Sequence, residues 1–224
     1  MRALRGLFDN DDTLRPFYSY ALTEYNRKYK TSHVFTDLRY HHLDEVLGTT
    51  RDETVAFFQY FLESATFKRL RPYDSAPPAI KALRDAGDTQ SILSALSPKH
   101  QARTEQYASR HFGNCFKFID MLNFTGNTAE RKADRAEELR GDYLVEDRAD
   151  TAIAVAARGI HVFVPVKPWN LSLVNTEHPR ITLVKPWWHP SEGPRAAQDT
   201  YVPRGLPDLV SAVNELRLPP PKGL

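Results

Sequence analysis

The sequence contains a single cysteine, Cys115, among its 224 residues. One cysteine excludes an internal disulfide bond and is typical of proteins from a reducing compartment. Long apolar runs are also lacking, so no segment is expected to cross a bilayer as a helix. No basic segment followed by an apolar one opens the chain, as a secretion signal would. We therefore expect a cytoplasmic protein without a membrane partner.

A strong excess of charge of one sign is absent as well. The chain has 30 lysines and arginines against 28 acidic residues, a formal net charge of +2. This balance does not produce the basic field that a stable nucleic-acid partner requires. The apolar fraction of 41% and the charged fraction of 26% are ordinary for a globular protein. The length allows one domain with an insert, or two small domains.

The most informative stretch is residues 7–14, Leu-Phe-Asp-Asn-Asp-Asp-Thr-Leu, where a short apolar segment ends in acids. On an extended chain residues i and i+2 point the same way, so Asp9 and Asp11 would enter one small volume. Two carboxylates at such a short distance repel each other unless a cation lies between them or one of them keeps its proton. The alternative interpretation is a turn, which Asp and Asn favour by bonding their own backbone.

Beyond residue 76, helical and extended patterns alternate. The expected helices span residues 76–87, 98–111, 127–139, 150–157 and 207–216. The expected strands span residues 1–8, 89–94, 116–124, 143–145 and 160–164. This alternation predicts an α/β fold, a doubly wound parallel sheet with helices on both faces.

Residues 15–70 carry a helical pattern rich in tyrosine and phenylalanine. The pattern predicts a small helical bundle between the first strand and the rest of the sheet. A capping box at Thr50–Glu53 places the start of one of its helices.

Some side chains of this bundle are candidates for binding. Phe17, Tyr18 and Tyr40 would be able to stack on a planar ligand, but an aromatic stripe more often forms a packed core. His41 and Glu45 have the spacing of two metal ligands on a helix. Because no further ligands are near them in the sequence, a solvated face is favoured for this pair.

In doubly wound sheets, ligands bind beyond the carboxyl ends of the strands. Polar groups follow the predicted strands in a definite order and would converge at one edge: Asp9, Asp11, Ser94, Lys132, Glu146 and Asp147. A shifted register would bring Ser97 and Lys99 to the edge in place of Ser94, but the predicted strand end favours Ser94. The order of these groups favours a catalytic site over a simple turn.

The same residues resemble the haloacid dehalogenase-like hydrolase superfamily. Its four motifs are similar, in order, to residues 8–14 (Asp-x-Asp-x-Thr), Leu93-Ser94, Lys132 and residues 144–147 (paired acids). A narrower resemblance, to the 5′(3′)-deoxyribonucleotidase branch, lies in residues 67–76, 143–148 and 159–170. The superfamily resemblance covers roughly residues 4–165, and it implies a Rossmann-like core.

The resemblance also implies a domain organisation. The core would comprise residues 1–14 and 71–218, and residues 15–70 would form a helical cap inserted after the first motif. Residues 219–224, rich in proline, are expected to form a disordered tail.

The chemistry that the resemblance implies is phosphomonoester hydrolysis through an aspartyl-phosphate. Asp9 would be the nucleophile, and Asp11 would give a proton to the leaving oxygen and then take one from water. Ser94 and Lys132 would bind the phosphate group. The implied substrate, a small molecule, is a (deoxy)nucleoside monophosphate, as for a 5′(3′)-nucleotidase. Sugar phosphates, nucleic-acid 3′-phosphate ends and a catalytically weak binding protein of this fold are the alternatives.

Mg²⁺ is the cofactor that the resemblance implies, a hard ion with oxygen ligands. The carboxylates of Asp9 and Asp147 and the backbone carbonyl of Asp11 would bind it, with Glu146 acting behind them or through water. Three features depart from the family pattern: Asp12 replaces a glycine, Glu146 replaces the first aspartate of the pair, and Pro77 and Pro78 crowd the start of a helix. Whether the protein forms a homodimer is left open.

Two further features carry expectations. The tetrapeptide Val-Lys-Pro-Trp occurs at residues 166–169 and again at 184–187. Two such strand ends would be able to flank one edge of the sheet, although chance or shared strand chemistry explains the repeat equally well. Asp150 is expected to cap the helix that follows it rather than to bind a metal.

Overall fold

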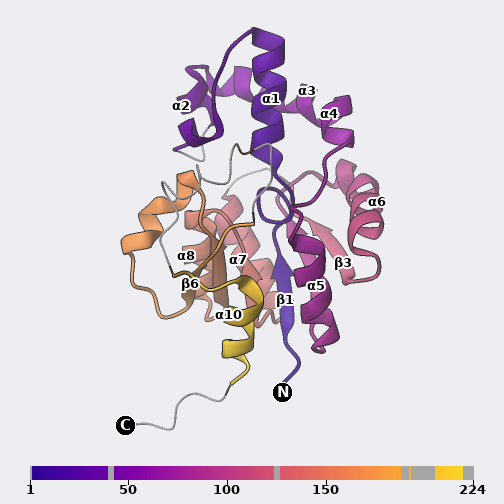
Figure 1. Ribbon diagram of the computed structural model, residues 1–224, viewed down its shortest axis with the longest axis vertical. Coiled ribbons are helices and arrows are strands. Elements are labelled where there is room, and N and C mark those ends of the chain that lie inside the picture. Colours follow the sequence, from indigo (N-terminus) through magenta and orange to yellow (C-terminus); the bar gives the residue numbers. More distant parts are fainter. Residues whose placement is uncertain (1, 40–42, 124–126, 188–191, 193–204, 219–224) are drawn as a thin grey trace.

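The structure is a computed structural model that describes residues 2–39, 43–123, 127–187, 192 and 205–218. Its centre is a six-stranded parallel sheet with the order β3-β2-β1-β4-β5-β6 (Figure 1). The strands are β1 (Arg5–Phe8), β2 (Thr89–Ser94), β3 (Phe116–Met121), β4 (Tyr143–Val145), β5 (His161–Pro165) and β6 (Ile181–Val184). The predicted doubly wound parallel sheet is confirmed. The order in which the chain adds strands changes direction between β1 and β4, so β1, β2 and β3 lie on one side of this point and β4, β5 and β6 on the other.

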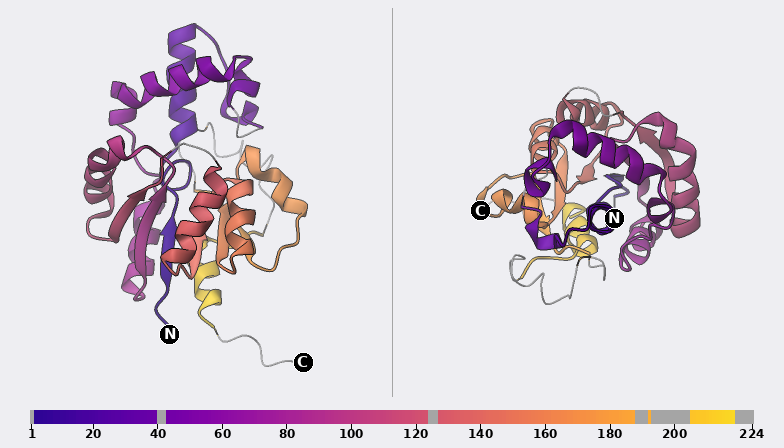
Figure 2. Two further views of the ribbon diagram at one scale, coloured as in Figure 1. Left: turned by 180° about the vertical axis from the view of Figure 1, so that it is seen from behind. Right: turned by 90° about the horizontal axis from the view of Figure 1, so that it is seen from above.

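Helices cover both faces of the sheet. One face carries α5 (Ala76–Asp85), α6 (Gln101–Phe112) and α10 (Leu209–Leu216), and the other carries α7 (Thr128–Glu138) and α8 (Ala149–Ala157). Figure 1 shows α5 and α10 in front, and Figure 2 shows α7 and α8 from behind. Neighbouring strand residues alternate between the two cores, so Phe8 packs with the first set of helices and Leu7 with the second. Among the described helices, none has the length and apolar character that a membrane crossing requires.

The first strand forms although two of its residues, Arg5 and Gly6, have a low propensity for strands. Both of its edges are paired, with β2 and with β4. A Cβ atom on Gly6 would lie 2.3 Å from the phenolic oxygen of Tyr143, so only glycine lets that ring pack beneath the strand. The strand predicted at residues 116–124 is shorter, since β3 ends at Met121 and Asn123 has a left-handed φ of 66°.

Residues between β1 and α5 form a helical insert above the carboxyl ends of the strands (Figures 1 and 2). It comprises α1 (Phe17–Tyr29), the 3₁₀ turn η1 (Phe35–Asp37), α2 (Leu43–Leu47), α3 (Arg51–Glu63) and α4 (Ala65–Lys68). The predicted capping box is present, because the Thr50 hydroxyl accepts from the Glu53 N–H and the Glu53 carboxylate accepts from the Thr50 N–H. Tyr40 and His41, two of the binding candidates, and the proline-rich tail lie outside the described residues.

A separate apolar core holds the insert together and joins it to the sheet. Phe17, Tyr18, Phe57 and Phe61 are buried in it, as a packed aromatic stripe predicts. Trp169, which follows β5, belongs to the same core, and its ring packs edge-on against that of Tyr18 at 5.3 Å. The insert is therefore packed against the edge of the sheet that carries the predicted site.

Candidate active site

Three acids meet at the carboxyl edge of the sheet, between β1 and β4, where the strand order changes direction. Asp9 follows β1, and its backbone N–H donates to the Val145 carbonyl at the end of β4 at 2.9 Å. Glu146 and Asp147 follow β4 directly. Carboxylate oxygens of Asp9, Glu146 and Asp147 lie within 4.8 Å of one another, and all three side chains are buried. The structure thus brings these three predicted residues together at the point where such sheets bind ligands.

Lys132 supplies the cation of this group from α7. The helix begins at Thr128, after the capping residue Asn127, whose side chain accepts from the Glu130 N–H, and this start directs Lys132 toward the sheet. The Lys132 ammonium donates to Asp9 Oδ1 at 2.5 Å and to Glu146 Oε2 at 2.7 Å. Only 2% of this lysine is exposed, so its charge acts in a setting of low dielectric.

Burial and crowding set the protonation of the group. Burial, together with the charges of Glu146 and Asp11, raises the pKa of Asp9 to about 7 despite the opposing effect of Lys132. Burial also raises the pKa of Asp147 well above its ordinary value, as do the charges of Glu146 and Asp9. Burial alone would lower the pKa of Lys132, but its two carboxylate partners outweigh this and raise it. When ionised, the three acids outweigh the one lysine, and this excess of negative charge fits a hard divalent cation such as Mg²⁺.

Hydrogen bonds distinguish the two acids after β4. Both oxygens of Glu146 already have donors, because Oε1 accepts from the Arg148 N–H at 3.1 Å and Oε2 from Lys132. Asp147 Oδ2 accepts from the indole N–H of Trp169 at 2.9 Å, and the Asp147 carbonyl accepts from the Asn170 amide at 2.8 Å. Glu146 is therefore placed to secure the lysine, while Asp147 is oriented by residues that follow β5.

Asp11 lies close to the three acids but has a separate partner. Its charge contributes to the raised pKa of Asp9. Its carboxylate accepts from the Nε–H of Arg15 at 2.6 Å, an ion pair that the sequence did not indicate. The structure thus places the two aspartates of the first motif near each other, with Asp11 Oδ1 bound to a cation of its own.

The departure at Asp12 has a structural reason. Its φ of 58° lies in the left-handed region, where glycine is the usual residue and Asp is tolerated better than most others. Its carboxylate accepts from the Tyr18 N–H at 3.0 Å, and so satisfies an amide in the first turn of α1. Asp12 therefore anchors the start of the insert.

Ser94 and Asp150 have local hydrogen bonds. Ser94 lies at the end of β2, and its hydroxyl accepts from the Leu96 N–H at 3.3 Å. We expected Asp150 to cap α8, but this prediction is wrong, because Arg148 occupies the capping position. The Asp150 carboxylate instead accepts from the Arg148 guanidinium and from the Thr151 N–H. A pair with the neighbouring cation thus competed successfully with the capping role.

A second buried cation, Lys167, lies under the insert. Its ammonium donates to the Tyr73 hydroxyl at 2.6 Å and to Glu192 at 2.7 Å. Burial raises the pKa of Asp12 well above its ordinary value, and the charge of Lys167 opposes this rise. The repeated Val-Lys-Pro-Trp was the sequence signal for this residue. Both copies approach Tyr73, since the ring of Trp187 lies 6.5 Å from that of Tyr73.

In a chelator, the Asp9 carboxyl group is expected to make the protein less stable as the pH rises from about 4 to about 7. Across this range the unfolded chain has lost the proton, at an ordinary pKa of 3.8, while the folded chain keeps it until about 7. The contribution is on the order of 1–3 kcal/mol. Urea denaturation of wild type and Asp9→Asn at several pH values isolates this group by difference. A wild type that gains stability relative to the variant with rising pH would contradict the expectation.

Comparison of the sequence with models of protein families and with curated proteins gave no match. Solved structures do match. A haloacid dehalogenase-like family hydrolase from Streptococcus pneumoniae has 14% identity and a TM-score of 0.60, over 82% of this chain and 95% of that one. A protein from Lactobacillus delbrueckii subsp. bulgaricus, described as a phosphoglycolate phosphatase, has 13% identity and a TM-score of 0.57 (83% and 95%). A protein from Clostridium difficile, described as a phosphatase, has 14% identity and a TM-score of 0.56 (90% and 100%). This chain therefore has the fold of the haloacid dehalogenase-like hydrolases.

Proposed function

We propose that this protein is a Mg²⁺-dependent phosphomonoester hydrolase that forms an aspartyl-phosphate at Asp9. The observation that carries the proposal is that the buried Lys132 contacts both Asp9 and Glu146. Asp147 lies beside them, at the carboxyl edge of the sheet between β1 and β4. A buried lysine that neutralises one carboxylate oxygen suits a site that must receive an anionic ester. The likeness in fold to proteins described as phosphatases agrees with it.

In the first step, Asp9 Oδ2 attacks phosphorus, because Oδ1 is bound to Lys132. A bond forms between Oδ2 and phosphorus while the bond from phosphorus to the leaving oxygen breaks. The electron pair stays on the leaving oxygen, which takes a proton from the Asp11 carboxyl group and departs as an alcohol. Covalent capture divides one difficult displacement into two easier ones.

In the second step, Asp11 accepts a proton from a water molecule as the water oxygen bonds to phosphorus. The bond from phosphorus to Asp9 Oδ2 breaks, and its electron pair restores the Asp9 carboxylate. Inorganic phosphate leaves, and Asp11 again carries the proton that it gave up at first. Both steps need Asp11 to face the same oxygen position, so its orientation matters in each.

The donors around Asp9 fit Mg²⁺ by their hardness and by their excess negative charge. Asp9, Asp147 and the backbone carbonyl of Asp11 would hold the ion, with Glu146 behind them. When bound, Mg²⁺ offsets charge on the transferring phosphoryl oxygens. Lys132 and Ser94 would contact phosphate oxygens. The Ser94 hydroxyl accepts from Leu96 and can still donate its own hydrogen.

We propose residues 15–70 as a cap that excludes water and selects the leaving group, over a core of residues 1–14 and 71–218. The resemblance of residues 67–76, 143–148 and 159–170 to the 5′(3′)-deoxyribonucleotidase branch supports a nucleoside monophosphate as the substrate. The phosphoglycolate phosphatase description of one structural neighbour makes a small phosphorylated acid the second candidate.

Phosphate release from nucleoside monophosphates is expected to require Mg²⁺ and to stop in a chelator. The panel should include sugar phosphates, phosphoglycolate and 3′-phosphorylated oligonucleotides, and the highest kcat/KM identifies the substrate class. A nucleoside monophosphate preference supports the nucleotidase proposal, and a preference for another ester corrects the substrate. No release from any ester above background would contradict the hydrolase itself.

A further inference from the structure

Arg15 is a buried cation that the proposed chemistry does not yet use. Only 2% of the residue is exposed. Its guanidinium carbon lies 4.8 Å from the ring centre of Phe67, in α4, and 4.9 Å from that of Tyr107, in α6. Its Nε–H donates to Asp11 Oδ1 at 2.6 Å. A planar cation between two aromatic rings has few orientations, so it holds its partner in a defined place.

The backbone around Arg15 is equally constrained. The Arg15 N–H donates to the Asn10 carbonyl at 3.2 Å, and the Arg15 carbonyl accepts from the Asp12 N–H at 2.7 Å. These bonds close the loop that carries Asp11. One residue earlier, the Leu14 carbonyl accepts from the Tyr73 N–H, which joins the two chain segments that connect the insert to the sheet.

The hydrogen bonds of Arg15 argue against a purely stabilising role. Burying a guanidinium costs free energy unless its donors are satisfied, and an apolar side chain of similar size would often serve stability as well. Among the described residues, Arg15 Nη2 has no hydrogen-bond partner. What the arginine supplies, and an apolar residue would not, is the bond to Asp11.

Resting on the proposed hydrolase reaction, we propose that Arg15 is a positioning residue that fixes the Asp11 carboxyl group for proton transfer. Arg15 occupies Oδ1, so Oδ2 gives its proton to the leaving oxygen as the bond from that oxygen to phosphorus breaks. In the second step Oδ2 takes a proton from water as the water oxygen bonds to phosphorus. Arg15 itself exchanges no proton and touches no reacting atom.

The test is the dependence of the loss on the leaving group. We compare kcat/KM for a nucleoside 5′-monophosphate, whose alkoxide needs a proton, with that for p-nitrophenyl phosphate, whose phenolate does not. Arg15→Gln is expected to lower kcat/KM for the nucleoside monophosphate by about a hundredfold and kcat/KM for p-nitrophenyl phosphate by only about tenfold. Arg15→Lys keeps the charge but lacks the planar group and Nε, and should show the same selective loss. Phe67→Leu, which removes one ring from the clamp, should show a smaller selective loss.

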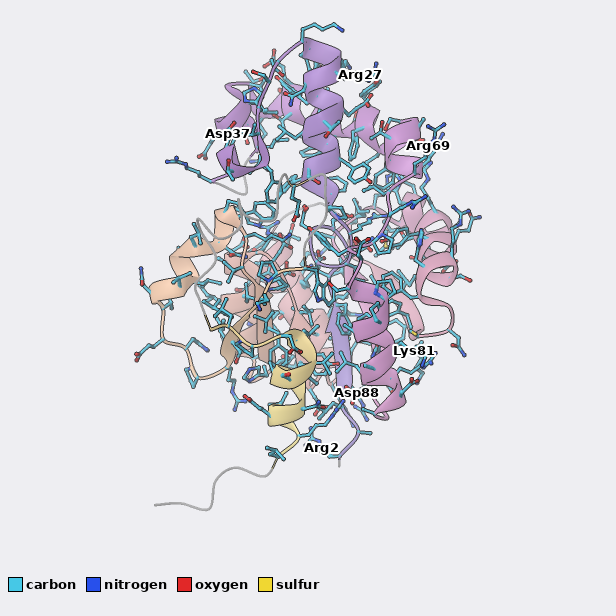
Figure 3. All side chains as sticks on the ribbon, viewed as in Figure 1. Arg2, Arg27, Asp37, Arg69, Lys81 and Asp88 are labelled. Atoms are coloured by element: carbon cyan, nitrogen blue, oxygen red, sulfur yellow. The ribbon has the colours of Figure 1, made fainter. Side chains whose placement is uncertain are left out.

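Arg217→Gln is the matched control, because Arg217 forms an ion pair with Asp88 at 2.6 Å and both side chains are fully buried. Figure 3 places Asp88 at the end of the molecule opposite the insert. This variant should change both substrates equally. Equal losses for both substrates in the Arg15 and Phe67 variants would overturn the inference and leave the hydrolase intact. A wild type that hydrolyses neither substrate would overturn the proposed function and the inference with it.

Discussion

Replacing Asp9 with asparagine is expected to lower the rate of phosphate release by about a thousandfold or more. The amide has nearly the shape of the carboxylate and can still accept from Lys132 through its oxygen. It is not a nucleophile, so the covalent step has no substitute. Steady-state kinetics measure the loss. Mass spectrometry of acid-quenched enzyme should find a phosphoryl group on the wild type and none on the variant.

The control for this substitution is Asp142→Asn. The Asp142 carboxylate accepts from the Arg5 N–H at 2.8 Å, at the amino end of the sheet. It resembles Asp9 in chemistry but lies at the opposite end of the strands, and its variant should keep wild-type turnover. If Asp9→Asn retained activity similar to that of Asp142→Asn, the aspartyl-phosphate mechanism would be wrong.

Replacing Lys132 with methionine is expected to cost about 3–5 kcal/mol of unfolding free energy near pH 8 in a chelator. The substitution leaves Asp9, Glu146 and Asp147 buried without the cation that offsets them. Losing the lysine also removes a charge that lowers the pKa of Asp9 and of Asp147, so the folded variant keeps their protons to a higher pH than the folded wild type does. The loss should therefore shrink toward about pH 4, where Asp9 keeps its proton in both folded proteins because its pKa in the wild type is already about 7. Urea denaturation at the two pH values measures it.

Lys81→Met is the matched control for Lys132→Met. Lys81 also pairs with an aspartate, Asp85, but 64% of its side chain is exposed (Figure 3). Exposed pairs contribute about 0–1 kcal/mol, so this variant should unfold close to the wild type. A Lys132→Met variant as stable as Lys81→Met at the higher pH would contradict the account of the buried group.

Sequence patterns were sufficient for the doubly wound sheet and for placing four candidate residues at its carboxyl edge. Asp9, Glu146 and Asp147 follow strands directly, so a correct strand end places them at the carboxyl edge. Lys132 follows a helix start that Asn127 marks, and the helical period then directs it inward. These positions depend on local rules, which the sequence displays.

The partners of Asp11, Asp12 and Asp147 could not be predicted, because tertiary contacts decide them. Arg15 is four residues from Asp11, yet its burial depends on rings from two distant helices. The sequence showed Asp12 only as a replacement for a glycine, whereas its carboxylate accepts a hydrogen bond from an amide of α1. Trp169 reaches Asp147 only because β5 lies beside β4. Such pairings carry no periodic signal along the chain.

The hydrogen bond from Tyr73 to Leu14 has a consequence for how substrate would reach the acids. The two segments that lead into and out of the insert are joined at one point, so neither can swing outward alone. Any opening is then a tilt about this pivot. Asp11 and Arg15, a few residues from it, would shift little, while the far end of α1 would travel furthest (Figure 1). A movement of the insert that admits substrate would thus leave the position of Asp11, the proposed proton donor, largely unchanged.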